Sequence, residues 1–175
     1  MKHYTLLTLL FLSLLLSACN GGGSEWDFTG TWHSNLTITT EDLVESGLLA
    51  GMPEGSEVNS SIEGDYTFKE DGSYDYDATI GIAMNMGVIS FDLQAAYEEH
   101  GTWELRDDML ITHIEESSTS ALDEATQTFI NNAGDAAFGK KEGETSQLRI
   151  ISYNGNTVTL EDQELKGVEV VYTRK

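Results

Sequence analysis

The feature that most constrains this chain is a long alternation of apolar and polar residues between Ile62 and Tyr97. Successive side chains of a β-strand point to opposite faces, so this alternation predicts strands with one buried face. The alternation changes parity near Gly87, which predicts a bulge or a turn there. Asp71-Gly72 interrupts it earlier with a dipeptide typical of tight hairpins. This region therefore predicts antiparallel β-structure.

Shorter alternating segments on both sides raise the expected total to about eight or nine strands. The expected strand segments are 28–38, 62–69, 74–88, 89–97, 101–105, 109–114, 148–153, 158–161 and 168–172. Their hairpin-like spacing favours an up-and-down antiparallel meander. Closing a meander into a barrel removes its exposed edges, so we expect a mainly β fold built on a barrel.

Two helices are expected to interrupt the strands. Thr39 is predicted to cap a short helix that ends near Gly51. A longer helix is predicted from apolar residues spaced three and four apart between Leu122 and Ala137, with Ser120 as its N-cap and Gly139 at its end. We expect this helix to pack over one mouth or flank of the barrel. A lid that opens for a ligand is the alternative.

The chain begins with a basic residue, Lys2, and an apolar run over residues 6–16 that leads to Leu16-Ser17-Ala18-Cys19. The run is too short to span a bilayer, which takes about 20 apolar residues, and it predicts a secretory signal peptide. The last four residues resemble the lipobox of bacterial lipoproteins. That resemblance implies a diacylglycerol on Cys19, cleavage before it and acylation of the new amino terminus. An ordinary signal peptide with a chance cysteine is the alternative.

These features divide the chain into a signal peptide over residues 1–18, a lipidated cysteine with a Gly-rich tether over 19–27 and a barrel domain over 28–175. The lipid would anchor the protein in the cell envelope. Asn20 follows Cys19, where an Asp would imply retention at the inner membrane. The resemblance therefore favours the outer membrane, with the domain in the periplasm or at the cell surface.

The chain is strongly acidic, with 9 basic and 30 acidic residues and a net charge of −21. Such a surface repels nucleic acid and anionic lipid headgroups, so we expect no nucleic-acid partner. It would attract a basic protein partner or divalent ions. Solubility in a salty medium is the preferred explanation of the charge, and attraction of such partners is the alternative.

Gly30-Thr31-Trp32 and Arg174 lie near the two ends of the expected barrel. This arrangement is similar to that of lipocalins and the wider calycin group. The resemblance implies that Trp32 plugs the closed end of a lipocalin-like barrel and that Arg174 lies across its ring. Ordinary core packing of Trp32 is the alternative, because Gly101-Thr102-Trp103 repeats the tripeptide in mid-chain.

No group of residues predicts catalysis. His33, His100 and His113 lack the paired spacings of metal sites, and the chain has no nucleophile elbow and no phosphate-binding glycine loop. We therefore expect no enzyme, no metal and no cofactor. A weak surface calcium site is the alternative, formed by Asp71, Asp75 and Asp77 or by Glu98-Glu99 with Asp107-Asp108.

Apolar and aromatic side chains of the alternating region are expected to face the barrel interior. The candidate cavity-lining residues are Tyr66, Phe68, Tyr74, Tyr76, Ile80, Ile82, Met84, Met86, Phe91 and Leu93. Small barrels are often filled by such side chains, whereas the flexible methionines favour an adaptable cavity. A hollow barrel predicts binding of a small apolar ligand or lipid. A filled barrel predicts a protein-interaction module of the envelope, such as an assembly factor, an inhibitor or an immunity-type lipoprotein.

Overall fold

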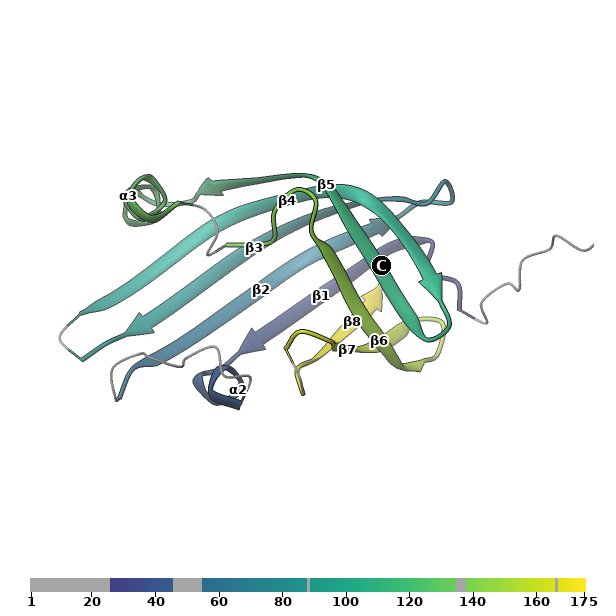
Figure 1. Cartoon of the computed structure of the whole chain (residues 1–175), viewed down its shortest axis with the longest axis horizontal. Coiled ribbons are helices and arrows are strands. Elements are labelled where there is room, and N and C mark those ends of the chain that lie inside the picture. Colours follow the sequence, from purple (N-terminus) through teal and green to yellow (C-terminus); the bar gives the residue numbers. More distant parts are fainter. Residues whose placement is uncertain (1–25, 46–54, 88, 135–137, 166) are drawn as a thin grey trace, which may run out of the picture.

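A computed structural model of the chain describes residues 26–45, 55–87, 89–134, 138–165 and 167–175. Within these residues the chain forms a closed antiparallel up-and-down barrel, in which every strand bonds its sequence neighbours and the last strand bonds the first (Figure 1). The strands are β1 (Gly30–Ile38), β2 (Glu57–Phe68), β3 (Ser73–Asn85), β4 (Ser90–Arg106), β5 (Met109–Ala121), β6 (Thr145–Tyr153), β7 (Thr157–Asp162) and β8 (Glu169–Arg174). The expected fold class is confirmed.

The parity change near Gly87 is a turn between β3 and β4, because Met86 donates its backbone N–H to the carbonyl of Ile89 at 2.8 Å. The segments 89–97 and 101–105, which the sequence suggested as separate strands, form one strand, β4. The register between β4 and β5 shifts at His100 and Gly101. β5 carries the extra residue of this bulge, which lets the long pair of strands bend and continue.

The barrel is closed over only part of its length. β1 pairs with β8 through Trp32, His33 and Ser34, and β5 pairs with β6 only over 109–113. β3 and β4 pair over their whole facing lengths, between Ser73 and Asn85 on β3. Figure 1 shows β2 to β5 running on past the shorter β6 to β8. We call the part around Trp32 the closed half and the part built on the extended strands the open half.

The short helix α2 (Thr40–Glu45) begins where the sequence predicted. The side chain of Asp42 accepts hydrogen bonds from the backbone N–H of Thr39 at 2.7 Å and from its hydroxyl at 2.8 Å. Thr40 ties the helix to β2 because its hydroxyl accepts from the backbone N–H of Val58 at 2.8 Å. The predicted end of this helix at Gly51 lies outside the described residues.

The longer helix α3 (Glu124–Ala133) differs from its prediction at both ends. Its N-cap is Asp123, whose side chain accepts from the backbone N–H of Thr126 at 2.8 Å. The predicted cap, Ser120, is wrong because β5 extends through it. Gly134 ends the helix with a φ of 84°, a conformation that favours glycine. The predicted end at Gly139 is therefore also wrong, and Ala136 and Ala137 lie outside the described residues.

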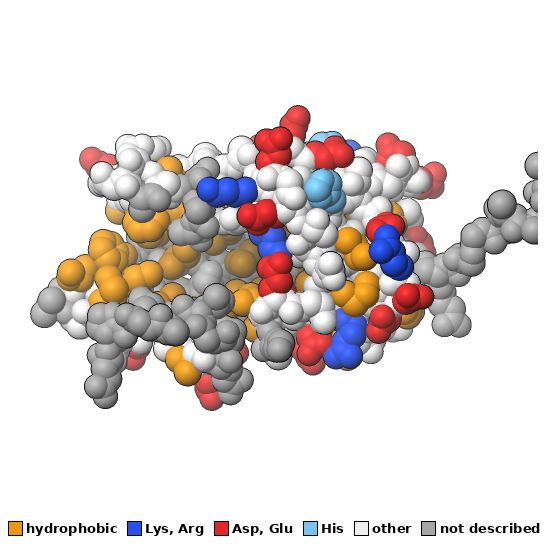
Figure 2. All heavy atoms as spheres, in the orientation of Figure 1, with side chains coloured by type: hydrophobic (Ala, Val, Ile, Leu, Met, Phe, Trp, Pro, Cys, Tyr) orange, Lys and Arg blue, Asp and Glu red, His pale blue; other side chains and the backbone are white. Residues whose placement is uncertain are grey.

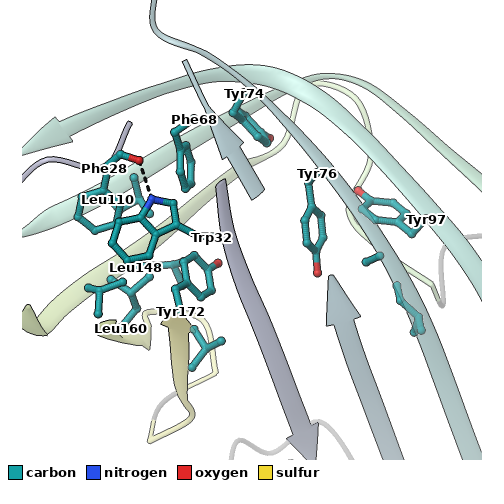
Figure 3. Packing of buried hydrophobic residues seen from close by; sticks show 14 of the residues in the cluster. Phe28, Trp32, Phe68, Tyr74, Tyr76, Tyr97, Leu110, Leu148, Leu160 and Tyr172 are labelled. Carbon is teal, nitrogen blue, oxygen red and sulfur yellow. Dashed lines mark hydrogen bonds between the residues drawn. The ribbon is translucent and has the colours of Figure 1, made fainter. Parts of the chain in front are cut away.

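Trp32 forms the centre of the closed half. Its ring is 0 % exposed, and its Nε1–H donates to the carbonyl of Phe28 at 2.7 Å (Figure 3). Arg174 lies over the ring with its guanidinium carbon 4.5 Å from the ring centroid. The guanidinium also donates to the backbone carbonyls of Thr29 at 2.8 Å and Gly155 at 3.0 Å. This one side chain therefore joins the start of β1, the β6–β7 turn and the end of β8.

Gly30 makes that arrangement possible. Its φ is +108°, which L side chains rarely adopt, and a Cβ there would lie 3.4 Å from Nη1 of Arg174. The glycine of the Gly-Thr-Trp segment is therefore required by backbone conformation. The second copy of the tripeptide is different, since Trp103 is half-buried and its Nε1–H donates to the carbonyl of Lys69 at 3.1 Å.

Candidate ligand site in the barrel

A cavity of about 220 Å³ lies inside the barrel next to the Trp32 core. Its apolar walls come from β1, β2, β3, β5, β6 and β8 and from the β7–β8 turn. The apolar lining residues are Leu36, Ile38, Ile62, Ile80, Ile114, Leu148, Leu165 and Val170. On the face shown in Figure 2, hydrophobic side chains gather over the half where the extended strands and α3 lie. The interior is therefore filled by side chains around Trp32 in the closed half and is hollow next to them, toward the open half.

One side of the cavity is an aromatic wall. The rings of Tyr66 and Tyr76 stack with centroids 3.8 Å apart, and the ring of Tyr172 stacks on Tyr66 at 5.2 Å. Tyr97 meets Tyr76 edge-on with centroids 6.1 Å apart. In Figure 3, Tyr76 and Tyr97 stand apart from the group around Trp32. The tyrosines bring aromatic rings and hydroxyl groups to the lining of the cavity.

Glu99 brings a carboxyl group to this wall. It is half-buried on β4 and lines the cavity. The hydroxyl of Tyr74 donates to its Oε1, and the hydroxyl of Tyr97 donates to its Oε2 at 2.7 Å. A carboxylate has about four lone-pair positions, so two phenol donors leave it able to accept further hydrogen bonds. Glu99 is thus held in place without being saturated.

The surroundings of Glu99 raise its pKa above the ordinary value of a glutamate. Burial raises the pKa of Glu99, and the hydrogen bonds from Tyr74 and Tyr97 only partly oppose this. The hydroxyl of Tyr97 also lies 2.9 Å from the carbonyl of Lys140, and its single proton serves one acceptor at a time. When Glu99 is protonated, its carboxyl O–H can donate a hydrogen bond to the hydroxyl oxygen of Tyr97, while the hydroxyl of Tyr97 donates to the carbonyl of Lys140. Burial likewise raises the pKa of Tyr74 and Tyr97 and keeps both phenols neutral.

The segment after α3 closes one side of the cavity. Gly139 lies against Tyr97, where a Cβ would come within 2.4 Å of the ring, so only glycine fits this approach. Lys140 lines the cavity, but its ammonium pairs with Glu164 at 2.8 Å. Asp162, the other charged lining residue, accepts backbone hydrogen bonds from Glu164 at 2.7 Å and Leu165 at 2.9 Å. Both side chains therefore already have partners in the β7–β8 turn.

A second hollow lies between β4 and α3. It measures about 740 Å³ and is lined by Phe91 and Leu93 on the strand and by Ala125 and Phe129 on the helix, among others. Phe91 is 40 % exposed there. This groove is wider and more open to solvent than the barrel cavity, and it lies beyond the closed half.

The structure distributes the ten predicted lining residues over several places. Tyr66, Tyr76 and Ile80 line the barrel cavity. Phe68 and Tyr74 pack in the closed half, although Tyr74 reaches Glu99 through its hydroxyl. Ile82 is partly buried and packs against the core, whereas Phe91 and Leu93 line the groove between β4 and α3. Met84 lies beside Phe91 where β3 ends and β4 begins, and Met86 lies in the turn between these strands.

Sequence reasoning missed the polar part of the site. Glu99 was considered only as a surface carboxylate beside Glu98. The signal was present, because Glu99 continues the inward parity of Leu93, Ala95 and Tyr97 along one strand. A charged residue on the inward face of an alternating strand is the observation that points to a site.

The histidines form ion-pair or hydrogen-bond contacts on the outside of the barrel. His33 lies 2.9 Å from Asp65, and His100 lies 2.8 Å from Asp75. In the part of the chain that the structure describes, no three His, Cys, Asp or Glu side chains form a group able to hold a metal ion.

The calcium alternative is wrong for Glu98-Glu99 with Asp107-Asp108. Glu98 and Glu99 pair with Ser118 and Ser117 on β5, whereas Asp107-Asp108 form the distant β4–β5 turn. In the other proposed group Asp75 pairs with Lys69 at 2.6 Å. The acidic side chains are therefore spread over separate contacts.

Comparison with protein-family models finds no match to this chain, and comparison with curated proteins finds none either. Among the described residues no helix is both long and apolar enough to cross a membrane. Cys19 and the residues around it lie outside the described ranges. The barrel and its cavity are therefore the features from which function is argued.

Proposed function

We propose that this protein is a binding protein that holds a small ligand inside its barrel. The observation that carries the proposal is the cavity of about 220 Å³ beside the Trp32 core. Ligand sites in proteins are concave and mostly apolar, with a few polar groups that fix orientation. Leu36, Ile62, Ile80 and Val170 supply apolar walls, and Glu99 supplies a polar group. The cavity suits a small apolar or amphipathic molecule and is below the usual range for drug-sized ligands.

The resemblance of Leu16-Ser17-Ala18-Cys19 to a lipobox supports a second part of the proposal. The protein would be a lipoprotein anchored through Cys19 in a bacterial envelope, and Asn20 favours the outer membrane. Replacement of Cys19 by Ser should abolish incorporation of labelled palmitate and leave the chain in the soluble fraction or uncleaved. Incorporation of label into that variant would contradict the assignment.

Native mass spectrometry of the protein purified from its own host tests the binding function. We expect a co-purifying small molecule in the wild-type protein. Val170→Phe should remove it, because Val170 is 8 % exposed and lines the cavity. Val171→Phe is the matched control, since the neighbouring side chain points outward and is 45 % exposed. Equal loss in both variants, or retention in both, would contradict binding in the cavity.

The alternative is a protein-interaction module of the cell envelope. The groove between β4 and α3 supports it, because Phe91 lines the groove and is 40 % exposed. Ile89 and Leu122, which precede β4 and α3 in the chain, are 49 % and 53 % exposed. Exposed apolar side chains rimmed by polar residues are typical of interaction sites. A partner would be basic, given the net charge of −21. In this case Phe91→Ser should abolish binding of the protein partner, and Val170→Phe should leave that binding unchanged.

A further inference from the structure

We infer that the barrel cavity is selective for a small cationic amphiphile, an organic amine whose ammonium group pairs with Glu99. This inference rests on the proposed function and names the chemical class of its ligand. It follows from the position of Glu99, from the aromatic wall beside it and from the charge of the cavity lining.

Glu99 is the cavity residue best placed to recognise a charged group. Its two hydrogen-bond partners within the barrel, Tyr74 and Tyr97, are neutral phenols. Each donates one proton, so the carboxylate keeps lone pairs for a ligand donor and has no cation paired with it in this contact. A buried charge is stabilised when an opposite charge and hydrogen bonds accompany it, and an ammonium group would supply both.

The neighbouring tyrosines favour a cation further. Tyr66, Tyr76 and Tyr97 line the same space, and since Tyr66 stacks on Tyr76 and on Tyr172, the ring of Tyr97, which meets Tyr76 edge-on, is the one best able to present a face to a ligand. Aromatic rings attract ammonium groups through the negative potential of their faces. Apolar side chains on the opposite strands, including Leu36 and Val170, would contact the hydrocarbon part of the ligand.

The remaining charges argue against an anionic ligand. Lys140 is the cationic residue of the lining, and its ammonium already pairs with Glu164 at 2.8 Å. Glu99 and Asp162 leave the lining with more acidic than basic groups. The net charge of −21 would also attract a cation toward the barrel and repel a fatty-acid carboxylate.

The cavity volume guides the choice of probes. A volume of about 220 Å³ equals the share of about seven liquid water molecules, at roughly 30 Å³ each. Hexylamine, hexanol and hexanoate have this size and differ only in their head group. They form a matched set in which the hydrocarbon tests the cavity and the head group tests Glu99.

Isothermal titration calorimetry of the three probes against the purified protein tests the inference. We expect hexylamine to bind at least about tenfold more tightly than hexanol, as one charge-assisted hydrogen bond allows, and hexanoate to bind most weakly. In Glu99→Gln the preference for hexylamine over hexanol should disappear while hexanol binding stays. Glu98→Gln removes the same charge from the exposed neighbour and should keep the preference.

The pH dependence provides a readout that does not need a variant. The titratable groups that share the cavity with Glu99 or contact it are Tyr66, Tyr74, Tyr76, Tyr97, Tyr172, Lys140 and Asp162. The tyrosines stay neutral because burial raises their pKa values. Since an ammonium pairs with the ionised carboxylate, hexylamine binding should weaken as pH falls through the raised pKa of Glu99, whereas hexanol binding should not change.

The outcomes separate the two proposals. Equal binding of hexylamine and hexanol, or an unchanged preference in Glu99→Gln, would overturn the inference and leave binding in the cavity intact. Tightest binding of hexanoate would also overturn it and assign recognition to Lys140. Failure of all three probes to bind would contradict the proposed function itself. If Glu99→Gln does not fold, the comparison of probes in the wild-type protein decides alone.

Discussion

Replacement of Trp32 by Ala tests the closed half of the barrel. Trp32 is 0 % exposed, and its ring contacts Phe28 and Tyr153 with centroids 5.5 Å and 6.2 Å apart. Removing a buried Trp typically costs about 3–5 kcal/mol, and the carbonyl of Phe28 also loses its donor, worth about 1 kcal/mol. Measured costs of removing a buried Trp already include part of the cost of its lost hydrogen bond. We therefore expect the free energy of unfolding to fall by about 4 kcal/mol.

Urea unfolding followed by far-ultraviolet circular dichroism measures this loss without relying on Trp fluorescence. With a slope of about 2 kcal/mol per M, the midpoint should fall by about 2 M. Trp103→Ala is the control, because Trp103 belongs to the second Gly-Thr-Trp segment but is only half-buried. Trp103→Ala should lower the free energy of unfolding by about half as much as Trp32→Ala. A loss below about 1 kcal/mol for Trp32→Ala, or a larger loss for Trp103→Ala, would refute the role of Trp32 as the plug of the closed half.

Three further predictions concern the same barrel. Arg174→Lys should lower the free energy of unfolding by about 1–2 kcal/mol in urea titrations, because Lys lacks the planar group that covers Trp32 and donates to several carbonyls; no change would show that these contacts are not stabilising. Gly30→Ala should cost about 1–3 kcal/mol by the same assay, since the φ of +108° strains any L residue, and a neutral result would mean that the turn relaxes. The raised pKa of Glu99 means that the folded state keeps its proton longer than the unfolded state, so this group lowers stability as pH rises through the range between its ordinary and raised pKa values. Glu99→Gln should therefore become increasingly stabilising, relative to wild type, as pH rises above the ordinary pKa of a glutamate, and a flat difference would contradict the raised pKa.

The sequence predicts the barrel because alternation is a local signal that each strand carries by itself. Tyr74, Tyr76 and Ile80 alternate with polar residues, and the structure places them on the inner face of β3. The ends of the elements were harder to predict. Ser120 is as good a cap residue as Asp123, and only the pairing of β5 with β4 as far as Ala121 decides between them.

The site itself depends on differences in strand length that no local pattern reports. β1 and β8 pair over three residues, so their backbone pairing stops at Ser34, although side chains from every strand still line the cavity beyond it. The approach of Gly139 to Tyr97 brings Lys140 to the cavity, and this contact joins residues far apart in the chain. The parity of β4 predicts that Glu99 points inward beside Tyr97, two residues earlier on the same strand, whereas the contact with Tyr74 follows from the register between β3 and β4.

The most direct test of a ligand site inside the barrel is nuclear magnetic resonance of the protein with hexylamine and, separately, with hexanol. We expect nuclear Overhauser contacts from the hydrocarbon of either probe to the methyl groups of Leu36, Ile62 and Ile80, which line the cavity. Contacts confined to Phe91 and Phe129 would place the ligand in the outer groove instead. That result, or the absence of any contact with both probes, would contradict the account.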